Sequence, residues 1–161
     1  MTDAPGTRLC PELALPRTPY RTDGQGGPRP SFGGIERVDP GADPRWPDCQ
    51  AVRYGFDLLD HGFPWEAHEV WEEPWRAAKS PDPAGAEFLQ VLIQIAAARV
   101  LIRDGRPEGA ARVAIRARRH LDACEGQAPR FGLTLAQVER ALTESTRPDA
   151  EHAPLRAAER S

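Results

Sequence analysis

The sequence has little that would place the protein in a membrane, outside the cell or on a nucleic acid. Its longest apolar stretch, residues 88–102, spans 15 residues and contains Gln90, Gln94 and Arg99, so it is too short and too polar to cross a bilayer. The first residues lack a charged stretch followed by an apolar run, which argues against a secretory signal. The net charge of -3 argues against a protein that coats nucleic acid.

Cysteine and lysine are also scarce. The three cysteines, Cys10, Cys49 and Cys124, are far apart and form no C-x-x-C pair, which is typical of reduced thiols in a cytosolic protein. Lys79 is the only lysine among 21 basic residues, which we interpret as compositional bias. We therefore expect a cytoplasmic protein that has no membrane partner and for which nucleic acid is not an expected partner. The sequence leaves oligomer formation open.

Proline, by contrast, is abundant, at 17 of 161 residues against a usual share of about 5%. Eight prolines and seven glycines fall in residues 1–45. A segment with so few apolar residues cannot bury enough surface to offset the entropy lost on ordering. We predict a disordered Pro/Gly-rich arm over residues 1–45, one folded domain over residues 46–145 and a polar tail over residues 146–161.

Strand-like alternation of apolar and polar residues is missing, whereas apolar residues recur at helical spacing throughout the predicted domain. The predicted fold class is therefore all-α, a compact bundle of four main helices plus a short C-terminal helix. Residues 83–104 are apolar on nearly every side, as in the buried central helix of a bundle. The predicted helix starts are a cap at Asp43 followed by Pro44, then Pro64, Pro83, Pro107 and a capping box of Thr134 and Gln137, with stops at Gly62 and Gly105.

Most side chains that could carry chemistry lie in residues 65–75 of the second predicted helix. His68 and Glu72 are one helical turn apart and lie at the edge of an apolar stripe. A carboxylate beside a histidine favours the charged imidazole and fixes its tautomer. The stripe itself contains Trp71 and Trp75, which we expect to be structural.

Two amides lie on the third predicted helix. Gln90 and Gln94 share one face of an otherwise apolar helix. Buried amides need hydrogen-bond partners, and His68 and Glu72 across the helix interface are the candidates. With Glu69, which follows His68 directly, these residues form the predicted polar cluster.

Four interpretations of this cluster stay open: a polar network that fixes helix packing, a pocket for a small ligand or a partner peptide, a metal site, and an acid–base pair. Glu72 stands where the H-E-x-x-H motif of a zincin has its second histidine, and no second helix repeats the E-x-x-H of a di-iron bundle. We therefore assign no metal ligand and leave the cofactor open. An enzyme of hydrolase type would use His68 with Glu69 or Glu72.

Arginine gathers on the fourth predicted helix. Residues 103–119 carry six arginines and two acids, and Arg112, Arg116 and Arg119 form one stripe. The stripe predicts either a solvated face with weak ion pairs or a site for an anion or nucleic acid.

Pro74 lies about ten residues into the second predicted helix. Proline at this position removes the hydrogen bond to the carbonyl of Val70. We therefore expect a kink or an end of the helix here.

Three sequence patterns follow one another at fixed distances. They are Gly55, Leu58-Leu59 and Gly62; then Glu66-Ala67-His68-Glu69, Glu72 and Trp75-Arg76; then Phe88-Leu89-Gln90, Leu92-Ile93-Gln94, Ala96 and Gly109-Ala110. Together, over residues 50–122, they resemble a bacterial and archaeal family called domain of unknown function 309. The resemblance implies a compact all-α bundle and no particular activity. The sequence departs from the family at Pro74, where a leucine-like residue is usual, and at Val91, where glycine is common.

The function we predict is that of a non-enzymatic binding or interaction module. Its partly buried His/Glu/Gln cluster would bind an unknown small ligand or a protein partner. A metal-dependent or acid–base enzyme that uses His68 is the alternative, and binding of an anion or nucleic acid through the arginine stripe is the second alternative. Whether the protein is an enzyme stays open.

Overall fold

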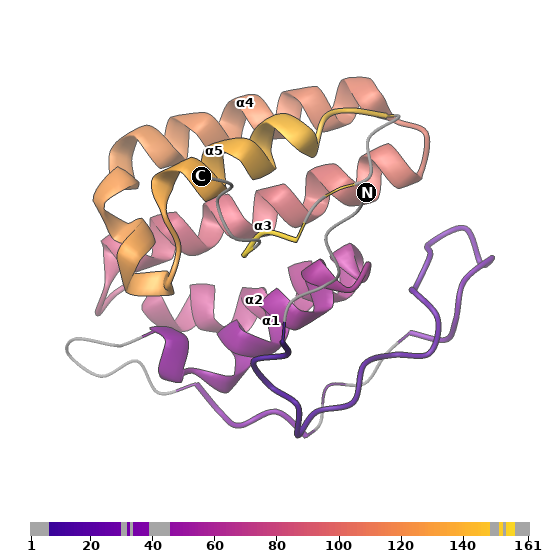
Figure 1. The fold of residues 1–161 in the computed structure, drawn as a ribbon, viewed down its shortest axis with the longest axis horizontal. Helices are drawn as coiled ribbons and strands as arrows, with labels where there is room; N and C mark the ends of the chain where they lie inside the picture. Colours follow the sequence, from indigo (N-terminus) through magenta and orange to yellow (C-terminus); the bar gives the residue numbers. More distant parts are fainter. Residues whose placement is uncertain are drawn as a thin grey trace.

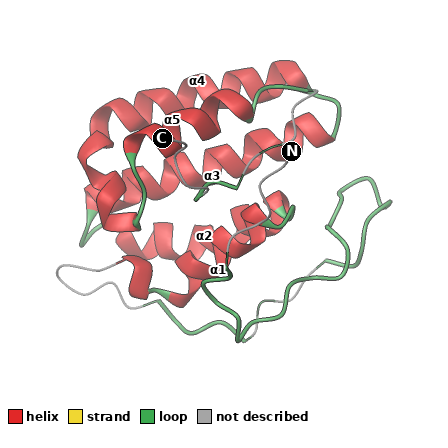
Figure 2. Cartoon of the chain, in the orientation of Figure 1, coloured by secondary structure: helices red, strands yellow, loops and turns green. Residues whose placement is uncertain are grey.

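The computed structural model describes residues 7–29, 32, 34–38, 46–148, 152 and 154–156. Its elements, in chain order, are η1 (Trp46–Asp48), α1 (Gln50–Asp60), α2 (Pro64–Ala78), α3 (Pro83–Arg103), α4 (Pro107–Cys124), η2 (Glu125–Phe131) and α5 (Leu135–Glu144). The described residues contain no strand, only an isolated β-bridge between Tyr20 and Gly27 (Figures 1 and 2). The predicted all-α bundle of four main helices and a short C-terminal one is confirmed.

Proline and glycine set most helix boundaries as predicted. Pro64, Pro83 and Pro107 are the first residues of their helices, where the missing N–H costs nothing. Gly62 and Gly105 lie just after helix ends with positive φ angles of 89° and 72°, which glycine adopts without strain. At α5, Thr134 and Gln137 form the predicted capping box.

The start of the first helix differs from the prediction. The predicted cap, Asp43 with Pro44, lies outside the described residues, and α1 begins only at Gln50, after the short helix η1. A helix capped by Asp43 would need the N–H of residue 47 for its first backbone hydrogen bond, and residue 47 is proline. Cys49 therefore takes the N-cap position.

Helix α3 is the centre of the bundle and packs between α2 and α4 (Figure 1). It has the length and composition of a membrane span, alone among the helices within the described ranges, but 67% of that window is buried inside the protein, as in a core helix. On its α2 side, Trp71 is fully buried and donates a hydrogen bond to the carbonyl of Val52 at 3.1 Å. Gly55 permits this contact, because a Cβ there would lie 2.0 Å from the Trp71 indole nitrogen. Trp71 therefore joins α2 to α1.

Pro74 lies inside α2, yet the helix continues to Ala78. The side chain is buried, so the ring packs within the bundle instead of facing solvent. Of the two predicted effects, the helix end does not occur.

The arm has no helix or strand among its described residues, in line with its composition, but that part of it lies against the bundle. The fully buried Cys10 belongs to the core, and Leu13 and Phe32 pack against it. Asp57 of α1 accepts backbone hydrogen bonds from Leu9 and Cys10, each at 2.8 Å. The arm (indigo to purple in Figure 1) therefore continues the fold along one side of the bundle.

The described part of the tail also contacts the bundle. Leu155 is fully buried, and its N–H donates to Asp60 of α1 at 2.7 Å. Arg140 of α5 donates to the carbonyl of Pro154 at 2.9 Å. These contacts place the tail across the end of α1 and beside α5.

Candidate functional site

Helix α2 brings together one histidine and two glutamates of the predicted cluster. Nδ1 of His68 lies 3.5 Å from Oε1 of Glu69 and 3.8 Å from Oε1 of Glu72. The Nδ1 atom is buried and has no hydrogen-bond partner, although the side chain as a whole is 29% exposed. Within the described ranges, this is the one group of three or more His, Cys, Asp or Glu residues whose ligand atoms all lie within 4.8 Å of one another.

The second oxygen of each glutamate faces an arginine. Nη2 of Arg76 donates to Oε2 of Glu72 at 2.5 Å, one turn along α2. Nη2 of Arg29, from the arm, lies 3.9 Å from Oε2 of Glu69. Each carboxylate therefore presents one oxygen to His68 and the other to a guanidinium group, through a hydrogen bond at Glu72 and a longer ion pair at Glu69.

The two predicted amides, Gln90 and Gln94, do not form the hydrogen bonds that we expected. Among the described residues, no hydrogen bond joins Gln90 or Gln94 to His68 or Glu72. Gln94 is 8% exposed and its Oε1 is buried without a partner. Their part in the site stays a prediction.

Gln90 lines a pocket that does not include His68, Glu69 or Glu72. This cavity, of about 320 Å³, is also bounded by Trp75, Lys79 and His120. The ammonium group of Lys79 lies 3.9 Å from the centre of the Trp75 ring, and His120 contacts Glu87 at 2.6 Å. Trp75 is thus partly buried at the edge of the core, whereas Trp71 is inside it.

Glu66, near the start of α2, is a buried acid outside the predicted cluster. The structure leaves it 0% exposed, because the arm covers it and the N–H of Tyr20 donates to its Oε2 at 3.1 Å. Burial raises the pKa of Glu66 above its ordinary value, while the charge of Arg103 acts to lower it. The helix pattern could not reveal this contact, since the covering segment lies 46 residues away in sequence.

Arg99 of α3 is a second buried polar residue and has polar and charged neighbours. Its Nε donates to the hydroxyl of Ser145 at 3.2 Å, and the residue is 5% exposed. Burial lowers the pKa of Arg99 to about 10, and the charges of Asp60 and Glu144 act against this shift. Burial also lowers the pKa of His152 in the tail. The apolar sequence around Arg99 predicted a core helix and gave no sign of these partners.

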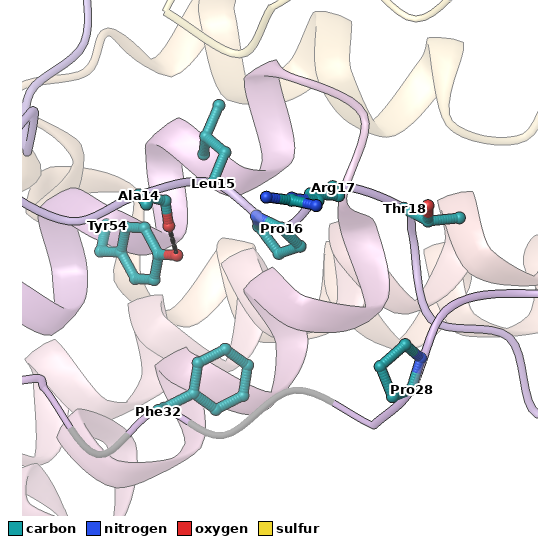
Figure 3. A pocket seen from close by; sticks show the side chains of 8 residues that line it. All are labelled: Ala14, Leu15, Pro16, Arg17, Thr18, Pro28, Phe32 and Tyr54. Carbon is teal, nitrogen blue, oxygen red and sulfur yellow. Dashed lines mark hydrogen bonds between the residues drawn. The ribbon is translucent and has the colours of Figure 1, made fainter.

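The arm and Tyr54 of α1 line a half-open pocket of about 460 Å³ (Figure 3). Its walls are mainly apolar, with Phe32 and Pro28 facing Tyr54 and Pro16 across the space. The Tyr54 hydroxyl donates to the carbonyl of Ala14 at 2.5 Å, so the wall on this side is fixed to α1. The cavity exists only while the arm is seated on the bundle.

The arginine stripe lies on α4. Arg112, Arg116 and Arg119 are all exposed there. Exposed arginines on one helix are equally typical of a solvated face, so binding of an anion or nucleic acid stays a prediction.

The fold and the cluster define a class: an all-helical bundle with a partly exposed His/Glu/Glu group on its second helix. Residues 52–113 match the model of a family described as a domain of unknown function (DUF309), which confirms the predicted resemblance over this part of the chain. The match extends from α1 into α4 and includes the whole cluster, but not the arm or α5. No curated protein and no solved structure matches the chain.

Proposed function

We propose that the protein is a binding module whose His68, Glu69 and Glu72 hold a divalent transition metal. The observation that carries this proposal is the convergence of one imidazole nitrogen and two carboxylate oxygens within 4.8 Å. Ligand atoms about 2.1 Å from a tetrahedral zinc ion lie roughly 3.4 Å apart. The distances from His68 Nδ1 to the two oxygens, 3.5 and 3.8 Å, are close to that separation.

The ligand types indicate which ions would bind. Imidazole nitrogen favours zinc, iron, nickel or copper over magnesium and calcium, which prefer oxygen alone. His68 Nδ1 is buried without a hydrogen-bond partner, so its lone pair is available to an ion when the imidazole is neutral and carries its proton on Nε2. We therefore expect zinc to bind more tightly than magnesium.

The two arginines would act as outer partners of the ligands. Arg76 and Arg29 each face the oxygen of a glutamate that points away from His68. Groups that hydrogen-bond to metal ligands hold them in the orientation that the ion requires. The same positive charges also repel a cation, so the affinity should be moderate.

Three protein ligands would leave a coordination position open, which a small anion, a side chain of a partner or a water molecule can occupy. A metal-dependent or acid–base enzyme that uses His68 with Glu69 or Glu72 is the alternative. The observation in its favour is partial exposure, since the side chains of His68 and Glu72 are 29% and 27% accessible to solvent.

Titration calorimetry of the full chain with zinc chloride and magnesium chloride tests the proposal. We expect one zinc ion per chain and a loss of affinity by about tenfold or more in His68→Ala and Glu72→Gln. The matched control is His120→Ala, whose histidine pairs with Glu87 outside the cluster, and its affinity should equal that of the wild type. Absence of zinc binding, or equal affinity in the wild type and His68→Ala, would contradict the proposal.

A further inference from the structure

A single residue of the arm, Tyr20, is held by its backbone from two helices at once. Its N–H donates to Oε2 of Glu66 on α2 at 3.1 Å. Its carbonyl accepts a hydrogen bond from Nη2 of Arg103 at the end of α3, also at 3.1 Å. Because both groups contact the backbone, this recognition is independent of the side chain and suits any extended residue.

The side chain of Tyr20 is recognised separately. Its ring lies on Trp65, the second residue of α2, with 4.1 Å between the ring centroids. The guanidinium group of Arg29 also lies near Trp65, 5.7 Å from the centre of its ring. Paired aromatic rings contribute beyond their buried area, so this contact selects an aromatic residue. We call Trp65, Glu66 and Arg103 the Tyr20 site.

Tyr20 does not use all the hydrogen-bonding groups of this site. Oε1 of Glu66 and both Nε and Nη1 of Arg103 are buried without a hydrogen-bond partner, although Nε lies 3.5 Å from Asp104. Glu66 is 0% exposed, so its free oxygen cannot bond to bulk water. Buried polar groups normally have hydrogen-bond partners. The unpaired atoms of Glu66 and Arg103 therefore indicate that the site can form further hydrogen bonds with a peptide other than its own arm.

The arm around Tyr20 is suited to leave. On either side, Arg17, Thr18 and residues 22–25 are exposed, and the nearest backbone contact, from Gly27 to the carbonyl of Pro19, lies within the arm itself. In Figure 1 the loop that follows Tyr20 projects beyond the bundle, beside the end at which α2 begins. The Tyr20 site can therefore be vacated without breaking a helix.

We propose that the Tyr20 site is a recognition site for an extended peptide of a partner protein that carries an aromatic residue, and that the chain's own Tyr20 occupies it in the absence of this partner. The extended form follows from the two backbone hydrogen bonds, and the aromatic residue follows from Trp65. The proposal does not depend on metal binding, because none of the residues of the Tyr20 site is a proposed metal ligand. The proposed ligands, His68, Glu69 and Glu72, are called the His68 group.

A labelled peptide tests this proposal on the full chain. The probe is a fluorescein-labelled peptide with the sequence of residues 16–24, Pro-Arg-Thr-Pro-Tyr-Arg-Thr-Asp-Gly, and fluorescence polarisation reports its binding. Because the wild-type arm competes as an intramolecular ligand, we expect the Tyr20→Ala chain to bind the probe about tenfold more tightly than the wild type. A probe with alanine in place of tyrosine should bind about tenfold more weakly.

Two further variants in the Tyr20→Ala chain locate the binding. Arg103→Met removes the donor to the peptide carbonyl and should weaken binding, whereas Arg112→Met, an exposed arginine of α4, should not. Circular dichroism confirms that each variant keeps its helices. Failure of the folded Tyr20→Ala chain to bind the probe, or equal binding in Arg103→Met, would overturn the proposal. A wild-type dimer that Tyr20→Ala abolishes would also overturn it, because the occupant would then be the arm of a second copy.

Discussion

In the bundle, α2, α3 and α4 are joined by buried apolar side chains, whereas the arm combines apolar contacts, at residues such as Cys10, Leu13 and Phe32, with polar side chains of α1 and α2 that bond to its backbone. Asp57, Tyr54 and Gln50 of α1 bond to the backbone of the arm at residues 9–10, 14 and 36. Glu66 does the same at Tyr20.

This difference separates two levels of stability. Apolar burial is spread over many contacts, so the bundle should unfold as one unit. The arm has no helix or strand among its described residues and is held by a few hydrogen bonds and by apolar contacts of residues such as Cys10 and Leu13. Segments with few contacts open at lower free energy than the core. The comparison therefore predicts that the arm can detach while the bundle stays folded.

The largest effect is expected inside the bundle, at Arg99. In Arg99→Met the carboxylates of Asp60 and Glu144 lose the buried charge that faces them, which should cost about 3–5 kcal/mol. Urea unfolding followed by circular dichroism measures this loss. His68→Ala, which removes a partly exposed side chain of α2, is the control and should cost much less. A loss at Arg99 no larger than at His68 would contradict the distinction between a buried and an available polar group.

Helix positions could be predicted because their causes are local in sequence. Pro64, Pro83 and Pro107 start helices, and the apolar run of α3 indicates a buried centre. Where a local rule failed, at the start of α1, a second local feature, Pro47, explains the difference. The His68 group was also predictable, since its three members lie within five residues of one helix.

The position of the arm on the bundle could not be predicted from the sequence of the arm. Its Pro/Gly-rich sequence has no periodicity, and many of its hydrogen bonds to the helices are made by its backbone, which leaves no pattern of side chains. The information lies in helix residues that look ordinary alone, such as Asp57 and Glu66. The relation of Gln94 to His68 depends on the rotation of α2 against α3, which helical spacing does not fix.

An intermediate effect is expected where the arm meets α1. Asp57→Asn removes the charge from the acceptor of the Leu9 and Cys10 amides, which should cost about 1.5–3 kcal/mol of arm docking but leave the helices intact. Burial, the hydrogen bond to Glu12 and the Glu12 charge raise the pKa of Cys10 to about 12, so the seated thiol is protonated at pH 8. Release of the arm should lower this pKa and speed its alkylation by about tenfold or more.

Alkylation with iodoacetamide at pH 8, followed by peptide mass spectrometry, measures this release. Cys124, at the end of α4, is the internal control, because burial in the bundle raises its pKa to about 11. Its rate should be the same in Asp57→Asn and in the wild type. If Cys10 and Cys124 speed up together in the variant, the arm and the bundle open as one unit and the comparison fails.

The smallest effect is a pH dependence at Glu66, where the arm meets α2. Burial raises the pKa of Glu66, so the folded chain holds this proton more tightly than the unfolded chain does. As the pH rises above the ordinary carboxyl pKa, the unfolded chain loses the proton first and the folded state becomes less stable. Glu66→Gln has no proton to lose and keeps an oxygen for the Tyr20 amide. The free energy of unfolding of Glu66→Gln relative to the wild type should therefore increase from about pH 4.5 to neutral pH.

Urea unfolding at several pH values measures this difference, with the exposed Glu73→Gln as control. Parallel pH profiles for Glu66→Gln and the wild type would mean that the arm leaves Glu66 in contact with water, and the contrast between an acid buried by the arm and one left exposed would disappear.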